Sequence, residues 1–265
     1  MSDAHGLAEL LKSSSLENII SDVLSQVKAK PEDIQLRKTL FKLYCIEGLW
    51  EKALMQIQTI ELIDEHSQQE AELCKNLVFS ELVRENVLMG TRTAGLLDDS
   101  SPEWMTLLLE ANRLHAANEP EQSEALRSQA FELAPESAGG GEMIGAFNWI
   151  ADSDGRIGPV CEFVSAGGYR QVPFSLIQMM SVAQPRDLLD LVWAPAHIKV
   201  NNEIYYGYIP ARYPLSPQAD QKIKLGLITE WQQQSELFST GMGRKVLITD
   251  RGEFSLLEVA DVRFA

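Results

Sequence analysis

The stretch Leu40-Phe-Lys-Leu-Tyr-Cys-Ile-Glu-Gly48-Leu-Trp-Glu-Lys-Ala-Leu54 decides the fold of the N-terminal half. Apolar residues recur at helical spacing on both sides of Gly48, from Asp33 to Ile63. A glycine between two amphipathic segments is a helix C-cap and turn signal, because glycine adopts positive φ without steric cost. The stretch therefore predicts an antiparallel helical hairpin.

The same pattern recurs on both sides of this hairpin. The segment after Gly48 resembles the second half of a tetratricopeptide unit, and Leu16 aligns with Trp50 at a spacing of about 34 residues. A third helical segment ends before Pro135. We therefore expect tetratricopeptide-like hairpins over residues 1–137, stacked into a continuous core with a concave, peptide-binding surface. An ordinary helical bundle would show the same spacing.

The segment Ser137-Ala-Gly-Gly-Gly141 changes the character of the sequence, because a glycine triplet cannot continue a helix without a large entropic cost. We place a domain boundary there and expect its glycines to form turns, as we do for Gly241-Met-Gly243. Residues 142–265 then predict a smaller, mostly antiparallel, β-rich domain, so that the fold class is α+β. A hairpin is expected at Asn201-Asn202, and a helix within 219–238. The predicted strands are 146–150, 169–173, 197–200, 204–209, 246–249 and 256–259.

Composition excludes several functions. With 38 acidic and 23 basic residues the chain has a formal charge of -15, which repels nucleic acid and anionic membranes. No apolar run is long enough to cross a bilayer, and no secretory signal is visible, so we expect a cytoplasmic bacterial protein. The three cysteines are widely spaced and predict buried free thiols; the four histidines are dispersed. We therefore expect neither a metal nor a cofactor.

The densest polar motif is Trp149-Ile-Ala-Asp152-Ser-Asp154-Gly-Arg156. It fails as a calcium loop, because Arg156 stands where a third oxygen ligand is needed. A structural turn is the favoured interpretation, with the aspartates accepting local backbone hydrogen bonds and Arg156 bridging them. A protein-binding surface and an acid/base pair at Asp152 and Asp154 remain alternatives.

Two further segments supply candidate protein-binding residues. Trp193 lies between prolines after an acidic, apolar stretch that predicts a short solvated helix entering a strand. Arg212 and Tyr213 lie between Pro210 and Pro214, which predicts a rigid, exposed segment suited to stacking or carboxylate pairing. An ordinary loop would explain the same sequence. No nucleophile motif accompanies these residues, so we expect binding rather than catalysis.

Seven strings taken together resemble the ImpE/TagJ family, also called SciE-type, in the same order along the chain. The N-terminal ones match the helical region of that family, and the remaining five match its C-terminal region. The strings are Leu36-Arg-Lys-Thr-Leu-Phe41, Gly48-Leu-Trp-Glu-Lys-Ala-Leu54, Trp149-Ile-Ala-Asp-Ser-Asp-Gly-Arg-Ile-Gly-Pro159, Asp187-Leu-Leu-Asp-Leu-Val-Trp-Ala-Pro-Ala196, Ile209-Pro-Ala-Arg-Tyr-Pro214, Thr229-Glu-Trp231 and Leu247-Ile-Thr-Asp250.

This resemblance implies a non-enzymatic accessory protein of bacterial type VI secretion. Such a protein binds the small sheath subunit and is linked to the AAA+ ATPase that recycles contracted sheath. We expect an amphipathic partner helix in a groove, with Lys or Arg at its rim to match the acidic chain. The alternatives are a general tetratricopeptide-like scaffold or chaperone for another client, and a hydrolase that uses Asp152 and Asp154.

Overall fold

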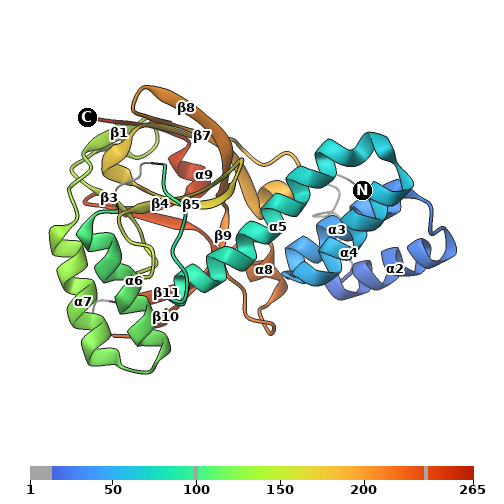
Figure 1. Cartoon of the computed structure of the whole chain (residues 1–265), viewed down its shortest axis with the longest axis horizontal. Helices are drawn as coiled ribbons and strands as arrows, with labels where there is room; N and C mark the ends of the chain where they lie inside the picture. Colours follow the sequence, from blue (N-terminus) through green and yellow to red (C-terminus); the bar gives the residue numbers. More distant parts are fainter. Residues whose placement is uncertain (1–13, 98–100, 236–237) are drawn as a thin grey trace.

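The computed structural model describes residues 14–97, 101–235 and 238–265, and it places a layer of helices beside a β-rich part (Figure 1). This arrangement confirms the predicted α+β class, with helical hairpins first and strands after them. The longer helices are α2 (Leu16–Ala29), α3 (Ile34–Glu47), α4 (Trp50–Ile63), α5 (Gln68–Leu88), α6 (Glu103–Ala116) and α7 (Pro120–Leu133).

Helices α3 and α4 form the predicted hairpin around Gly48. The side chain of Asp33 accepts hydrogen bonds from the backbone N–H groups of Gln35 and Leu36 and so begins α3. Gly48 ends α3 with a φ of 72°, and its N–H donates to the carbonyl of Cys45. The glycine is required because this left-handed backbone conformation is strained for residues with a Cβ.

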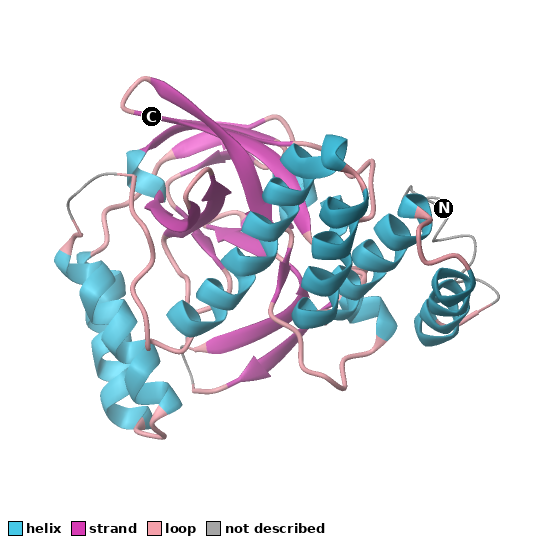
Figure 2. Ribbon diagram, turned by 45° about the vertical axis from the view of Figure 1, so that its right-hand side comes forward, coloured by secondary structure: helices cyan, strands magenta, loops and turns pink. Residues whose placement is uncertain are grey.

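Helix α5 joins the two parts of the molecule. It is 21 residues long and runs from the N-terminal helices across to the sheet, as both views show (Figures 1 and 2). The core formed by α2 to α5 continues into the β-rich part, where it includes Tyr169, Trp193 and Leu225. No helix within the described ranges has the length and apolar character needed to cross a membrane.

The β-rich part contains an eight-stranded sheet in the order β2-β1-β14-β6-β7-β8-β4-β5. Two three-stranded sheets, β10-β11-β9 and β13-β12-β3, lie beside it. Neighbouring strands pair antiparallel, as predicted. The strands are β1 (Gly139–Gly141), β2 (Gly145–Phe147), β3 (Ile150–Asp152), β4 (Val160–Ser165), β5 (Gly168–Pro173), β6 (Ile177–Val182), β7 (Trp193–Val200), β8 (Glu203–Pro210), β9 (Arg212–Tyr213), β10 (Thr229–Gln233), β11 (Ser239–Arg244), β12 (Val246–Thr249), β13 (Gly252–Ser255) and β14 (Asp261–Phe264).

The prediction of turns at the two glycine-rich segments is wrong, because both are strands. The glycine triplet is β1, paired with β14 on one side and β2 on the other. A Cβ at Gly139 would lie 2.5 Å from the carbonyl oxygen of Arg263, so glycine permits the close approach of these strands. The second segment lies in β11, between β9 and β10.

Helices α6 and α7 do not continue the N-terminal stack, so the expectation of one continuous core over residues 1–137 is wrong. They pack closely on each other, and Trp104, Leu108 and Ala130 share a separate core with Ile157 and Tyr213 of the β-rich part. The apolar face of this hairpin is therefore covered mainly by strands and turns, and among the N-terminal helices by Leu88 at the end of α5.

One predicted element near the C-terminus is also wrong, and another is much shorter than its segment. Residues 256–259, predicted as a strand, form α9 (Leu256–Val259), because Ser255 and Glu258 make a capping box at its start. The helix expected within 219–238 is α8 (Gln221–Lys224), which has four residues and is followed by β10. The hairpin at Asn201-Asn202 is confirmed, and both asparagines have positive φ, 51° and 65°.

Candidate functional site: a buried ionic cluster beside an acidic groove

The motif around Asp152 forms a tight turn between β3 and β4. Oδ1 of Asp152 accepts the backbone N–H of Asp154 at 2.9 Å, and Oδ1 of Asp154 accepts that of Arg156 at 2.9 Å. Arg156 also binds both oxygens of Asp154 through its guanidinium, at 2.9 and 2.5 Å. The predicted structural turn is confirmed, except that Arg156 pairs with Asp154 and does not bridge both aspartates.

Lys245 connects this turn to the central sheet. Its ammonium lies 2.5 Å from Oδ2 of Asp152 and 2.7 Å from Oε2 of Glu162 on β4. The three side chains are at most 2% exposed. Because water is excluded, each carboxylate depends on protein donors for its hydrogen bonds.

Helix α5 adds the other half of the cluster. Nε and Nη2 of Arg84 bind the two oxygens of Glu162 at 2.7 and 2.8 Å, and Nη1 lies 3.1 Å from Oε2 of Glu81. The hydroxyl of Tyr169 donates to Glu162 at 2.6 Å, and Nε1 of Trp193 donates to Oε1 of Glu81 at 2.9 Å. These charge-assisted bonds fasten α5 to the sheet.

The two carboxylates that share Lys245 differ in pKa. Burial disfavours ionisation of Glu162, but Arg84 and Lys245 outweigh burial and hold its pKa well below its usual range. Burial raises the pKa of Asp152 to about 6, because Lys245 offsets burial only in part and Glu162 and Asp154 repel the charge. The difference follows from the contacts: Glu162 has two cationic partners and Asp152 has one.

Arg212 and Tyr213 are buried, so the prediction of an exposed segment is wrong. They form β9, which pairs with β11 and turns both side chains into the protein. Tyr213 donates its hydroxyl to Oδ1 of Asp152 at 2.8 Å. The guanidinium of Arg212 donates to the carbonyls of Cys45 and Ile46 at 2.6 and 2.7 Å. Arg212 therefore satisfies carbonyl groups at the C-terminal end of α3.

The structure brings most of the predicted site residues together, but inside the protein. Asp152, Asp154, Tyr213 and Trp193 belong to one hydrogen-bonded cluster or adjoin it, and Trp193 also lies 5.8 Å from the ring of Trp50. These four residues and Arg212 are at most 4% exposed, whereas the side chain of Arg156 retains 20% exposure. Five of the six predicted binding residues are therefore inaccessible to direct contact from outside the protein.

Sequence reasoning missed four charged members of the cluster. Glu81 and Arg84 are three residues apart on a helix, a spacing typical of exposed ion pairs. Glu162 interrupts the apolar run Val160-Cys-Glu-Phe-Val164, and a charge inside a buried strand is the signal that identifies it. Lys245 follows a glycine-rich segment that resembles a loop, and nothing local marks it.

A groove of about 450 Å³ lies on the outer side of this cluster, between the end of α7, strand β3 and the β12–β13 hairpin. Its apolar lining includes Phe131, Ala134, Pro135, Trp149 and Ile248. Within the described part of the chain, the charged residues that line it are all acidic: Asp152, Glu136 and Glu253. Asp152 therefore belongs both to the groove and to the buried cluster.

A second hollow of about 360 Å³ adjoins the first at Phe131, and we call the two together the α7 groove. Glu124 and Glu132 add negative charge to it. Among the described residues that line it, Arg127 is the one cation; it is 2% exposed and lies over the ring of Phe238 at 3.8 Å. The exposed lining of the α7 groove is therefore apolar and acidic.

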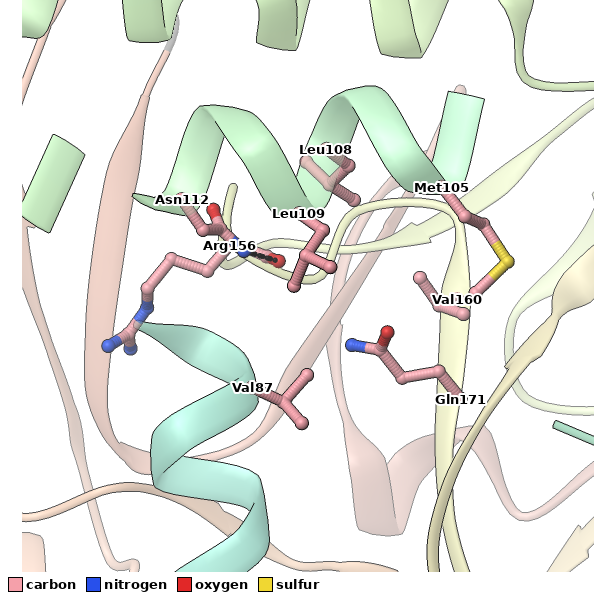
Figure 3. Close-up of a pocket in the computed structure, with 8 residues that line it drawn as sticks. All are labelled: Val87, Met105, Leu108, Leu109, Asn112, Arg156, Val160 and Gln171. Atoms are coloured by element: carbon pink, nitrogen blue, oxygen red, sulfur yellow. Dashed lines mark hydrogen bonds between the residues drawn. The ribbon is translucent and has the colours of Figure 1, made fainter. Parts of the chain in front are cut away.

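A smaller crevice lies where α6 meets the end of α5 and strands β4 and β5 (Figure 3). It holds only about 10 Å³, the room of one water molecule. The side-chain amide of Asn112 donates to the carbonyl of Arg156 at 2.9 Å beside it and so anchors α6 to the turn. The crevice marks a packing contact between elements.

Comparison with known proteins identifies the family. The family model described as ImpE protein matches residues 145–263. The type VI secretion system accessory component TagJ of Pseudomonas aeruginosa is 32% identical over 97% of this chain and 90% of its own length. The crystal structure of protein VPA1032 from Vibrio parahaemolyticus has the same fold, with a TM-score of 0.88, 23% identity and coverage of 97% of both chains. This chain therefore belongs to the ImpE/TagJ family.

Proposed function

We propose that this chain is a cytoplasmic, non-enzymatic accessory component of type VI secretion that binds the small sheath subunit. In this proposal a basic, amphipathic helix of that subunit lies in the α7 groove. The adaptor is thereby linked to the AAA+ ATPase that recycles contracted sheath. The accessory role follows the likeness to TagJ along nearly the whole of both chains.

The observation that carries this proposal is the combination of apolar lining and acidic rim in the α7 groove. A helix that docks in a groove buries apolar side chains along one face and leaves polar ones at its edges. Phe131 is 38% exposed at the junction of the two hollows, where it offers a ring for such a face. Exposed Glu132, Glu136 and Glu253 lie where the edges of the helix would pass.

The charge of the α6–α7 region supports a basic partner. Residues 103–136 contain seven glutamates and two arginines. Arg127 is buried, and Arg113 is paired with Glu110. This local excess of negative charge favours fast association with a partner that carries Lys or Arg, an effect that salt weakens.

A hydrolase that uses Asp152 and Asp154 receives less support. Both oxygens of Asp154 are engaged, one by the backbone and side chain of Arg156 and the other by Arg156 and the backbone N–H of Gly241. Asp154 is fully buried, so it has no free oxygen for a substrate. Asp152 is then the one member of the pair left for such chemistry, and both of its oxygens already accept hydrogen bonds, from Lys245, from Tyr213 and from the backbone N–H of Asp154.

Isothermal titration of the purified chain with the small sheath subunit tests the proposal. The informative variant reverses charge at the groove, Glu132→Lys with Glu136→Lys. The matched control, Glu32→Lys with Glu51→Lys, changes net charge equally on exposed positions of the N-terminal helical region. We expect saturable binding that the groove variant weakens at least about tenfold, about 1.4 kcal/mol, and that the control leaves within twofold. Equal effects of both variants would contradict the assignment to the groove.

A further inference from the structure

Asp152 is the residue where the α7 groove and the buried ionic cluster meet. It lines the groove, yet its side chain is only 2% exposed. Oδ2 binds Lys245 at 2.5 Å, and Oδ1 accepts the hydroxyl of Tyr213 at 2.8 Å and the backbone N–H of Asp154. Because Asp152 lines the groove and its carboxylate is buried, a charge that arrives in the groove acts on this carboxylate through a medium with little water.

The cluster contains one carboxylate more than it has cations. The carboxylates are Asp152, Glu162 and Glu81, and the cations are Lys245 and Arg84. Glu162 receives three of the hydrogen bonds from these cations, whereas Asp152 receives one. Of the two carboxylates that share Lys245, Asp152 is therefore the one that a proton neutralises at the lower cost, and neutralisation leaves two carboxylates against two cations.

The charged and titratable groups that face Asp152 come from several elements. Lys245, just before β12, attracts its negative charge, whereas Glu162 on β4 and Asp154 in the turn repel it. Tyr213 on β9 donates a hydrogen bond to it. Burial is the largest influence, and the sum raises the pKa of Asp152 to about 6. Asp152 therefore changes its charge between roughly pH 7 and pH 5.

We propose that binding in the α7 groove is linked to protonation of Asp152, so that the groove holds its basic partner most tightly while this carboxylate is ionised. The inference rests on the function proposed above and adds its regulation. A lysine or arginine of the partner above β3 stabilises the ionised form. By linkage, binding near pH 6 releases a proton, and acid weakens binding.

The free protein tests the first half of the inference without any ligand. Carbon-13 NMR of the aspartate carboxyl groups should show Asp152 titrating near pH 6. Acidification from pH 7.5 to 5.5 should raise the melting temperature of the wild type relative to Asp152→Asn, because the folded protein binds this proton more tightly than the unfolded chain. The control Asp22→Asn replaces an exposed residue on α2, and its melting temperature should change between pH 7.5 and 5.5 as that of the wild type does.

Two results in the free protein would overturn the inference. One is an Asp152 carboxyl group that titrates below pH 5. The other is the same dependence of melting temperature on pH in the wild type and in Asp152→Asn. Should Asp152→Asn not fold, the NMR titration of the wild type decides alone.

Calorimetry with the small sheath subunit tests the second half. Titrations at pH 6, in two buffers with different ionisation enthalpies, give the number of protons released on binding. Wild type and Asp22→Asn should release protons and lose affinity between pH 7.5 and 5.5, by up to about tenfold per pH unit below 6. Asp152→Asn should release fewer protons. Histidines of the partner contribute equally to the wild type and to the variant, so they cancel in the difference between the two proton counts.

The outcomes separate the linkage from the function. Binding with equal proton release in the wild type and in Asp152→Asn would overturn the linkage and leave the proposed function standing. No binding of the sheath subunit at any pH would overturn the proposed function, and the linkage with it, even where Asp152 titrates as expected.

Discussion

Arg84 on α5 and Glu162 on β4 lie 78 positions apart in the chain, and their side chains form two parallel hydrogen bonds of 2.7 and 2.8 Å inside the protein. Both side chains are at most 1% exposed. This pair connects the helix that reaches the N-terminal hairpins with the strand that leads out of the Asp152 turn. The relation of the two parts of the molecule therefore depends on a buried ion pair.

Loss of Arg84 should destabilise the protein strongly. Arg84→Met leaves Glu162 with Lys245 and Tyr169 only and leaves Glu81 without a cation, and an unpaired buried charge costs about 3–5 kcal/mol. Urea unfolding followed by circular dichroism measures the loss. The control is Arg113→Met on the exposed surface, which should leave the unfolding midpoint nearly unchanged. Similar midpoints for the two variants would contradict the structural role of the buried pair.

Glu162 should make the protein sensitive to acid. Its pKa is lower in the folded protein than in the unfolded chain, so the ionised form stabilises the fold above the ordinary value of 4.5. That contribution is lost as the pH falls through the range between the two values. Glu162→Gln should therefore be much less stable than the wild type at pH 7, with a difference that shrinks toward pH 3. Chemical denaturation at a series of pH values measures it, and a constant difference would contradict the depressed pKa.

Removal of the indole N–H of Trp193 should lower the free energy of unfolding, because the cluster also depends on neutral hydrogen-bond donors. Trp193→Phe leaves Oε1 of Glu81 without its partner at 2.9 Å, and an unsatisfied buried acceptor costs about 1–3 kcal/mol. The lost ring volume adds to this effect. Glu81→Gln combined with Trp193→Phe forms a double-mutant cycle, and the measured loss should be less than the sum of the two single losses. Strict additivity would show that the two side chains do not interact.

A methyl group at Gly207 should disturb the sheet. A Cβ there would lie 2.2 Å from the carbonyl oxygen of Val164 on the neighbouring strand, which cannot move away without breaking the sheet. We expect Gly207→Ala to destabilise the protein by about 1–3 kcal/mol, as overpacked positions do. Gly140→Ala, whose nearest atom would lie at 3.3 Å, is the milder comparison. Thermal unfolding ranks the two variants, and the reverse order would contradict the strand spacing described.

Helices and turns that are determined by residues close together in the chain were predictable from the sequence. The α3–α4 hairpin follows from apolar periodicity and from Gly48, and the β7–β8 hairpin from two asparagines that adopt positive φ. The strand predicted at 256–259 is instead α9, although Ser255 and Glu258 have the spacing of a capping box. The strand prediction relied on the apolar run and overlooked the capping signal, which was present in the sequence.

The cluster was only half predictable, because its members meet through the tertiary fold. The turn at Asp152 uses partners two residues away, so a sequence pattern suffices for it. Lys245 reaches Asp152 across 93 positions, and Arg84 reaches Glu162 across 78. The burial of Arg212 likewise depends on the pairing of β9 with β11, which no local pattern encodes.

Site-directed photo-crosslinking tests the central claim most directly. A benzoylphenylalanine is incorporated at position 132 on the rim of the α7 groove, or at position 51 on the exposed side of α4 as the control. Each protein is mixed with the small sheath subunit and irradiated, and the crosslinked peptides are sequenced by mass spectrometry. The account predicts crosslinks from position 132 to one basic, amphipathic segment of the subunit and none from position 51. Crosslinks from position 51 alone would contradict it.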